Sequence, residues 1–538
     1  MLKRGIVMKQ IKFRMTDQQN FRDAIEISEN NMPIDNSMKI ELLRRVFSKE
    51  KCSHYRMLRV EDDHVDFKSA NDEISIEDGL NENSRIGNIV GVVRELIEME
   101  NERYDVTVEI HSRFDNEDNS YFIRSLIFDS EILYDVAAIP KDIDNELVHQ
   151  GSFCLSDFLI GWSFAIKLLR AYENGVYCCY EDREYNDDRV CGTLDVNRHI
   201  RQNSGRNNMN VAYVKRERMQ NNALNRLILC THNFLREKHY YFEEKWEKNP
   251  DYSKAIGDIC SAINGEYGNA AKCIYENQKP ISSPYYTEYE SLRQLCIYIL
   301  TEEYGDIYGG NGNDEIHGIL LYIPDLWELF LKKQFSKYIP YICKYQENYK
   351  LDDMKISKYF ENRYNPDMLD YLYNVNRKAL KINTIRPDYV FCDKEHPDNS
   401  LFVLDAKHIK KERVYSSSDC FPKLWRDIEL IKFIMNKKAE YKIMIPYSPL
   451  GGLIFPIKQD ESVDEGSYFE FAETLQLKCY AIVVPQVPVG SESDYNYNNW
   501  KVLLDENIRE IIKVKLCNDI QASEERMNIC IKTGMNYR

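Results

Sequence analysis

The stretch Arg386-Pro-Asp-Tyr-Val-Phe391 and its counterpart Leu401-Phe-Val-Leu-Asp-Ala-Lys407 decide the fold of the C-terminal part of the chain. Both are short apolar runs with turn-forming residues between them, and this pattern predicts two strands. Asp388 begins the first strand, and Asp405 and Lys407 lie near the end of the second. Residues i and i+2 of a strand point to the same face, so Asp405 and Lys407 project together, and Asp388 joins them if the two strands are neighbours.

These two carboxylates and the lysine are suited to a hard-cation site. Mg²⁺ prefers oxygen ligands and retains several waters, and Mn²⁺ accepts similar ligands. A bound ion of this kind lowers the pKa of a coordinated water and stabilises charge on a phosphate. A lysine beside it orients the water or stabilises the added charge. The alternative is an ordinary surface hairpin in which Asp405 and Lys407 form a salt bridge.

A third acidic residue, Glu328, lies in the apolar run Ile323-Pro-Asp-Leu-Trp-Glu-Leu-Phe330. The proline near the start of this run predicts a helix over residues 324–338. A buried carboxylate without a partner is costly, which favours a role for Glu328 in the site. The alternative is that Glu328 occupies the exposed face of an amphipathic helix.

These segments resemble the PD-(D/E)xK nuclease superfamily, in which Pro387-Asp388 matches the first part of the motif and Asp405-Ala406-Lys407 the second. The helix and the two strands together resemble McrC-type restriction subunits, and the LlaJI-like branch in particular. The resemblance covers roughly residues 155–485. It includes four segments upstream of the site, namely Gly175 to Tyr180, Arg189 to Asp195, Arg198 to Ile200 and Asn221 to Ile228.

The resemblance implies a Mg²⁺-dependent DNA endonuclease subunit of a McrBC-like system that restricts foreign or phage DNA. Asp388, Asp405 and the backbone carbonyl of Ala406 would bind the metal, Lys407 would serve catalysis, and Glu328 would be an auxiliary acidic residue. The subunit would cut double-stranded DNA within a hetero-oligomeric complex, and it would stimulate a separate McrB-like AAA+ NTPase. One alternative is a catalytically inert structural activator of that NTPase with a relic nuclease fold. Another is a nucleic-acid-binding module with an inert nuclease fold.

The helix predicted after the lysine strand, over residues 422–438, departs from the family pattern. Relatives often carry a glutamine-containing motif there, and this helix has no glutamine. Asp427, Glu429 or Lys432 is expected to take the place of that glutamine.

The densest basic run of the chain lies between residues 198 and 218. Arg198, Arg201, Arg216 and Arg218 are candidates for contacts with DNA phosphates or with the nucleotide pocket of a partner NTPase, because an arginine supplied to a neighbouring subunit can stabilise phosphoryl transfer. The alternative is a solvated charged loop. Among the histidines, His408 is expected to face away from the site in a structural role, and His317 is expected to be incidental.

The fold class predicted from these patterns is a multi-domain α/β protein. Residues 1–150 form a mixed α+β adaptor region, with a short helix over 89–99 and a β-hairpin over 105–114 and 121–128. Residues 151–304 form a mainly helical region that docks on the AAA+ partner, and a glycine-rich break over 305–318 follows. Residues 315–490 form the PD-(D/E)xK core, with alternating helices and strands. Residues 491–538 form a polar and then helical tail.

Composition narrows the class of protein further. The net charge of −16 argues against adhesion to nucleic acid through bulk charge, although a local basic groove is compatible with it. The 15 cysteines are scattered without a Cys-x-x-Cys pair, which is typical of reduced core residues in the cytosol. No apolar run is long enough for a membrane span. A phosphate-binding Gly-x-x-x-x-Gly-Lys-Ser/Thr loop is absent from the sequence, so NTP hydrolysis is expected to come from the partner.

Overall fold

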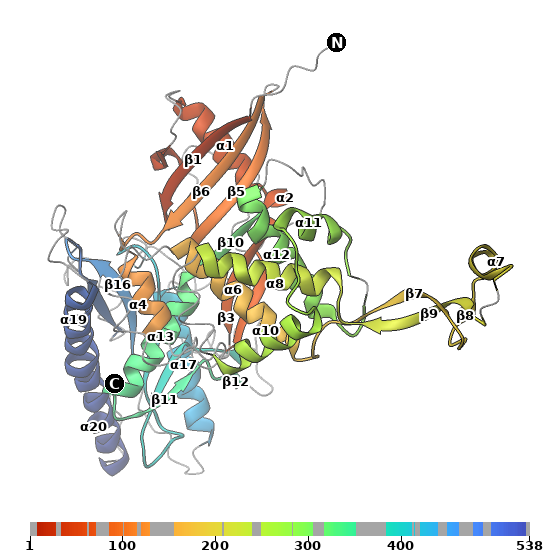
Figure 1. Ribbon diagram of the computed structural model, residues 1–538. Helices are drawn as coiled ribbons and strands as arrows, with labels where there is room; N and C mark the ends of the chain where they lie inside the picture. The colour runs from red at the N-terminus through yellow and green to blue at the C-terminus, as the bar shows by residue number, and fades with distance from the viewer. Residues whose placement is uncertain are drawn as a thin grey trace.

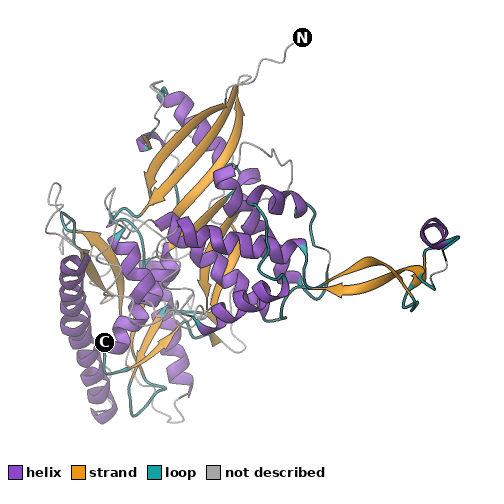
Figure 2. Ribbon diagram, viewed as in Figure 1, coloured by secondary structure: helices purple, strands orange, loops and turns teal. Residues whose placement is uncertain are grey.

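The computed structural model describes most of the chain, and Figure 1 shows the arrangement of its elements. The described residues are 8–27, 34–61, 64–70, 85–99, 102–115, 120–129, 155–206, 209–238, 249–281, 283–304, 317–350, 384–411, 414, 420–438, 449–461, 477–487 and 497–533. They combine helices with several separate sheets, which confirms a mixed helix-and-strand architecture (Figure 2). Within these ranges, no helix combines the length and the apolar character needed to cross a bilayer.

A seven-stranded sheet forms the N-terminal part, in the order β2-β1-β6-β5-β10-β3-β4. Its strands are β1 (Met8–Thr16), β2 (Ile25–Glu26), β3 (Tyr55–Glu61), β4 (His64–Ser69), β5 (Ile89–Met99), β6 (Glu102–His111) and β10 (Gly318–Tyr322). The short helices of this part are η1 (Phe21–Asp23), α1 (Asn36–Val46), α2 (Lys49–Cys52) and α4 (Tyr121–Asp129). Strands β3, β5 and β10 contribute to two apolar clusters, one with α1 and α2 and the other with the helical region.

Two predictions for this region are wrong. Residues 89–99 form strand β5 and not a helix, because burial alternates along most of the segment: Val93 and Ile97 are buried, whereas Leu96 is exposed. Residues 121–128 belong to helix α4 and not to the second strand of a hairpin. Asp115 accepts a hydrogen bond from the backbone amide of Phe122 at 2.7 Å, so a carboxylate satisfies the start of this helix, while Phe122, Ile123, Leu126 and Ile127 are buried.

Strand β10 comes from beyond the predicted boundary and lies inside the first sheet. It pairs antiparallel with β5 and parallel with β3. Gly318 fits there because a Cβ at this position would meet the Val93 side chain at 2.6 Å. Most of the glycine-rich break at 305–318 lies outside the described residues, and the predicted nuclease region at 315–490 therefore begins with a strand of the N-terminal sheet.

The middle region is mainly helical, as predicted. Its helices are α6 (Leu155–Tyr172), α8 (Ala223–Lys238), α10 (Pro250–Ala262), α11 (Ala270–Glu276) and α12 (Thr287–Tyr304). These helices share one apolar cluster with the N-terminal sheet and with the C-terminal part.

A narrow arm projects from the helical region (Figure 1). It is a three-stranded sheet in the order β7-β9-β8, with one helix at its far end. Its elements are β7 (Cys179–Asp187), β8 (Thr193–Leu194), α7 (Val196–Asn203) and β9 (Val211–Met219). The sequence predicted only a dense basic run here, because β7 is mostly polar and charged and β8 is only two residues long.

The C-terminal part is a five-stranded sheet in the order β11-β14-β15-β16-β17. Its strands are β11 (Ile342–Tyr345), β14 (Tyr389–Cys392), β15 (Ser400–Ala406), β16 (Leu450–Lys458) and β17 (Leu477–Val484), and a separate pair is β12 (Tyr349–Lys350) with β13 (Thr384–Ile385). The accompanying helices are α13 (Ile323–Tyr338), α17 (Phe421–Lys438), α19 (Tyr497–Ile508), η4 (Arg509–Leu516) and α20 (Cys517–Thr533). β14 and β15 are antiparallel, whereas β15, β16 and β17 are parallel.

Candidate functional site

The two predicted strands pair, and their pairing brings the two aspartates together. Tyr389 on β14 lies opposite Leu404 on β15, so Asp388, which precedes β14, lies beside the end of β15. Asp388 accepts a hydrogen bond from the backbone amide of Ala406 at 2.8 Å. Both Asp388 and Asp405 are buried. A surface hairpin therefore does not describe this site.

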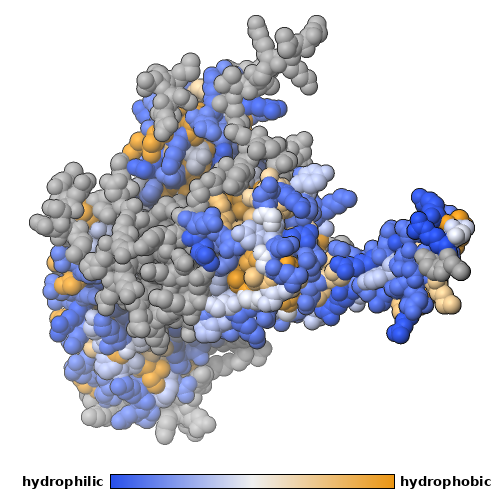
Figure 3. All heavy atoms as spheres, viewed as in Figure 1, coloured by the Kyte–Doolittle hydropathy of each residue, from blue (hydrophilic) through white to orange (hydrophobic). Residues whose placement is uncertain are grey.

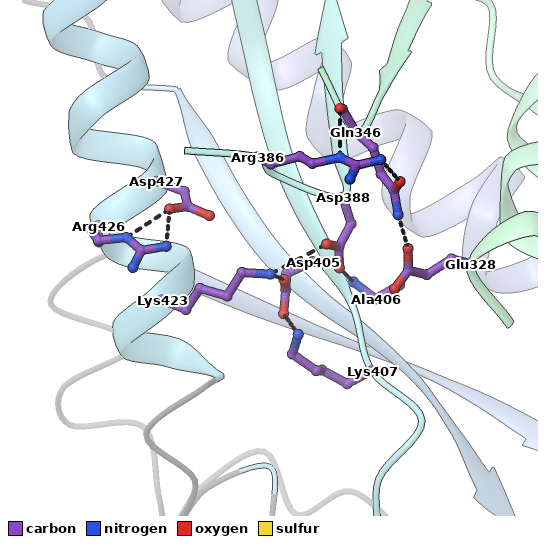
Figure 4. Close-up of polar contacts among 10 residues, drawn as sticks. All are labelled: Glu328, Gln346, Arg386, Asp388, Asp405, Ala406, Lys407, Lys423, Arg426 and Asp427. Atoms are coloured by element: carbon purple, nitrogen blue, oxygen red, sulfur yellow. Dashed lines mark hydrogen bonds and ion pairs between the residues drawn. The ribbon is translucent and has the colours of Figure 1, made fainter. Parts of the chain in front are cut away.

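Lys407 contacts Asp405 as the strand geometry predicts, with 2.7 Å between its Nζ and Oδ2 of the aspartate. A second lysine, which the sequence argument missed, completes the cluster. Lys423 in the first turn of α17 places its Nζ 2.5 Å from Asp405 and 3.3 Å from Asp388 (Figure 4). The signal that could have identified Lys423 is its place at the start of the helix that follows the lysine strand.

The two aspartates differ in pKa. Burial raises the pKa of Asp388, the negative charge of Asp405 adds to this effect, and the pKa is about 6. Burial also disfavours the charged form of Asp405, but Lys407 and Lys423 outweigh it and hold the pKa of Asp405 at about 2. Asp405 is therefore ionised at neutral pH, and both lysines keep raised pKa values because the carboxylates overcome the cost of burial.

Glu328 is half-buried on α13 and contacts the site through a glutamine. Gln346, which follows β11, donates a hydrogen bond to Glu328 at 2.6 Å, and its backbone amide donates to the carbonyl of Asp388 at 3.0 Å. Arg386 donates to the side chain and the carbonyl of Gln346 (Figure 4). Burial raises the pKa of Glu328 to about 8, and the charge of Asp388 contributes. Glu328 therefore does not lie on a solvent-exposed helix face.

The side chains expected to replace the missing glutamine have other contacts. Asp427 forms an ion pair with its neighbour Arg426 at 2.8 Å. Lys432 and Glu429 face each other at 4.0 Å. The residue of α17 that reaches both carboxylates is Lys423, one turn before Asp427.

The donor set fits a hard cation. Asp388 and Asp405 direct carboxylate oxygens toward one point, and the ammonium of Lys423 already lies there, which shows that this position stabilises positive charge. Ala406, whose carbonyl is the third oxygen donor expected from the sequence, is the last residue of β15. Oxygen donors of this kind suit Mg²⁺ or Mn²⁺ rather than a softer ion.

Comparison with known proteins assigns the chain to a family. A family model described as "McrBC 5-methylcytosine restriction system component" matches residues 84–421. The chain belongs to the McrBC family. Among curated proteins, none matches this McrBC-family chain.

Two solved structures from Thermococcus gammatolerans are similar to this McrBC-family chain at low identity. The first is a half-complex of McrB AAA+ hexamers with bound McrC, with 14% identity and a TM-score of 0.36, covering 93% of this chain and 100% of that one. The second is the McrBC complex, with 15% identity and a TM-score of 0.28, covering 61% of this chain and 88% of the other.

The four candidate arginines of this McrBC-family chain all lie on the arm, but in different environments. Arg198 is held within the arm, because it pairs with Glu184 at 2.9 Å and donates to the carbonyl of Tyr213 at 2.6 Å. Arg218 lies where the arm joins the body and donates to the hydroxyl of Tyr286 at 3.2 Å.

Arg201 and Arg216 have weaker contacts. Arg201, on α7, donates to the carbonyl of Asn197 at 3.2 Å in an exposed position. Arg216 lies over the ring of Tyr180, with 5.9 Å to the ring centroid. These two side chains are therefore better placed than Arg198 to reach another molecule.

The two histidines flagged in the sequence have separate surroundings. His408 is buried, with its ring against Phe114 and Phe122, its Nδ1 3.9 Å from a carboxylate oxygen of Asp17, and its carbonyl accepting a hydrogen bond from Gln18. His317 immediately precedes β10 and lies against Glu95 and His54.

Proposed function

We propose that this chain is the nuclease subunit of a McrBC-like restriction system, and that it hydrolyses phosphodiester bonds of double-stranded DNA with Mg²⁺. The observation that carries the proposal is the convergence of two buried aspartates and Lys407 at the paired ends of β14 and β15. Membership of a restriction-system family supports the same reaction. The PD-(D/E)xK resemblance gives each of these residues its proposed role.

Each residue of the site would have a separate role in the reaction. Asp388, Asp405 and the carbonyl of Ala406 would hold the metal, which when bound supplies an activated water and stabilises charge on the phosphate. Lys407 would place its ammonium at the reacting phosphate, because Asp405 keeps the lysine charged and oriented. Glu328, held by Gln346, would be an auxiliary carboxylate at the edge of the site.

We also propose that the chain works with an AAA+ NTPase and contacts it through the arm. One of the solved structures similar to this chain contains McrB AAA+ hexamers with bound McrC, and the chain itself has no phosphate-binding loop in its sequence. The arm exposes apolar side chains that its own fold does not bury, including Leu194, Val196 and Ile200. Figure 3 shows the arm as mostly hydrophilic, with apolar patches at its far end. An exposed mixture of apolar and basic residues on a projecting element is typical of a protein-binding surface.

The test is cleavage of plasmid DNA with Mg²⁺, with and without the partner NTPase and its nucleotide. Asp405→Ala and Lys407→Ala are measured beside the wild type. Cleavage that requires Mg²⁺ and the partner, and that disappears in both variants, is the expected result. Stimulation of the NTPase without any cleavage by the wild type would instead identify the chain as an inert structural activator.

A further inference from the structure

A second cluster of potential ligands lies in the N-terminal sheet, away from the aspartates. It consists of His54, Glu95 and His317, whose ligand atoms all lie within 4.8 Å of one another. Nδ1 of His317 is 2.7 Å from Oε1 of Glu95, and Nδ1 of His54 is 3.9 Å from the same oxygen. Both imidazoles therefore converge on one carboxylate oxygen.

Backbone hydrogen bonds hold these three residues in place. The amide of His317 donates to the carbonyl of His54 at 3.0 Å, and the amide of Arg94 donates to the carbonyl of His317 at 2.8 Å. His54 and His317 immediately precede the parallel strands β3 and β10, and Glu95 is on β5, the other neighbour of β10. The cluster is thus built on three adjacent strands, which limits the movement of its ligands.

The two carboxylate oxygens of Glu95 have different neighbours. Glu95 is only 1% exposed, so its charge requires compensation. Oε2 lies 2.8 Å from Nζ of Lys51, whereas Oε1 faces the two histidines. Lys51 therefore compensates the charge of the carboxylate at Oε2 and leaves Oε1 directed at the imidazoles.

The imidazoles have the chemistry of ligands. Metal binding requires neutral imidazole, and both histidines present Nδ1 to the same oxygen of Glu95. Nδ1 of His54 is buried and has no hydrogen-bond partner among the described residues. A buried nitrogen without a hydrogen-bond partner lowers the stability of the fold, and a bound cation would take the place of that partner.

We propose that His54, Glu95 and His317 bind one divalent transition-metal ion, and that this ion is zinc. Two imidazole nitrogens and one carboxylate oxygen are a set of protein ligands that zinc accepts, with water in the remaining position. Mg²⁺ does not suit the cluster, because it prefers oxygen ligands. The ion would join β3, β5 and β10 where the chain returns to the sheet from the helical region. β10 leads directly into α13, the helix that carries Glu328, so the ion would also anchor the start of that helix.

The test is the metal content and the cobalt spectrum of the full-length protein. To keep the aspartate site from contributing, all proteins in this experiment carry Asp405→Asn. After treatment with a chelator and incubation with a small excess of Zn²⁺, gel-filtered protein should retain about one zinc per chain. Co²⁺ in place of zinc should give the visible absorption bands of a low-coordinate cobalt site with imidazole ligands. Zinc should raise the unfolding temperature.

Two variants and a matched control decide which residues bind. His317→Gln and His54→Gln should lose the zinc, the cobalt bands and the zinc-dependent rise in unfolding temperature. His111→Gln should keep all three, because His111 also lies beside a glutamate of the same sheet but outside the cluster. A parent protein that retains no zinc and gives no cobalt bands would overturn the proposal, whether or not the variants fold. Equal zinc content in the parent and both cluster variants would overturn it as well.

Discussion

The ammonium of Lys423 lies 2.5 Å from Asp405 and 3.3 Å from Asp388, so a lysine from α17 bridges two carboxylates that come from the paired strands β14 and β15. Without this cation, two buried negative charges would repel each other at close range. A metal ion held by both carboxylates would occupy the position of this ammonium. Lys423 and a metal are therefore expected to compete for the two aspartates.

The first prediction concerns this competition. Lys423→Ala should lower the free energy of unfolding of the metal-free protein by about 2 kcal/mol, because the aspartates lose a partly buried ion-pair partner. Mg²⁺ should stabilise Lys423→Ala more than it stabilises the wild type, since no ammonium has to be displaced. Denaturant unfolding with EDTA and with Mg²⁺ measures both effects. Equal stabilisation of the two proteins by Mg²⁺ would show that Lys423 does not occupy the cation position.

The second prediction concerns catalysis by the central residues. Asp405→Asn and Lys407→Ala should each reduce Mg²⁺-dependent DNA cleavage by about 100-fold or more, because one removes a metal ligand and the other a charge that stabilises the transition state. Initial cleavage rates with the partner NTPase present measure the loss. Lys432→Ala is the control, because Lys432 is on α17 but faces Glu429 and not the aspartates. A loss of equal size in the control would point to damage of the fold instead.

The third prediction concerns pH. The pKa of Glu328 in the folded protein is raised from 4.5 to about 8, so the folded protein holds a proton that the unfolded chain releases. Stability from this group is therefore present at low pH and is lost as the pH rises from about 4.5 to about 8. Asp388, raised from 3.8 to about 6, acts in the same direction over a lower range.

Replacement of Glu328 isolates its share of this pH dependence. Glu328→Gln keeps an oxygen that accepts the hydrogen bond from Gln346 but cannot ionise. The free energy of unfolding in EDTA should then fall less steeply between pH 6 and pH 8 than it does in the wild type. Glu347→Gln, at an exposed neighbouring position, should leave the slope unchanged. A slope in Glu328→Gln identical to that of the wild type would contradict the raised pKa.

The fourth prediction separates the arginines of the arm. Arg201→Ala combined with Arg216→Ala should reduce stimulation of the partner NTPase at least about 5-fold without a change in the unfolding temperature, because both residues are exposed on the arm. Arg198→Ala should instead make the arm more sensitive to proteolysis, since Arg198 ties β7 to β9. Full stimulation by the double variant would exclude Arg201 and Arg216 as partner contacts.

The sequence by itself determined the convergence of Asp388, Asp405 and Lys407. Alternation on a strand places residues 405 and 407 on one face, and two short apolar strands joined by a turn-rich loop are natural neighbours. The same local reasoning identified helix α13 and the helical character of the middle region. The predictions for β5 and α4 were wrong, because a few residues can fit both the helical and the strand periodicity.

The tertiary structure alone decided the remaining features, because they depend on contacts between segments far apart in the chain. Lys423 and Gln346 reach the aspartates from α17 and from the end of β11, and neither contact follows from spacing. Strand β10 enters the N-terminal sheet between β5 and β3, long after both in the sequence, and so brings His317 beside His54 and Glu95. Local patterns specify which face a side chain occupies, whereas its neighbours across the sheet are set by the packing of the whole chain.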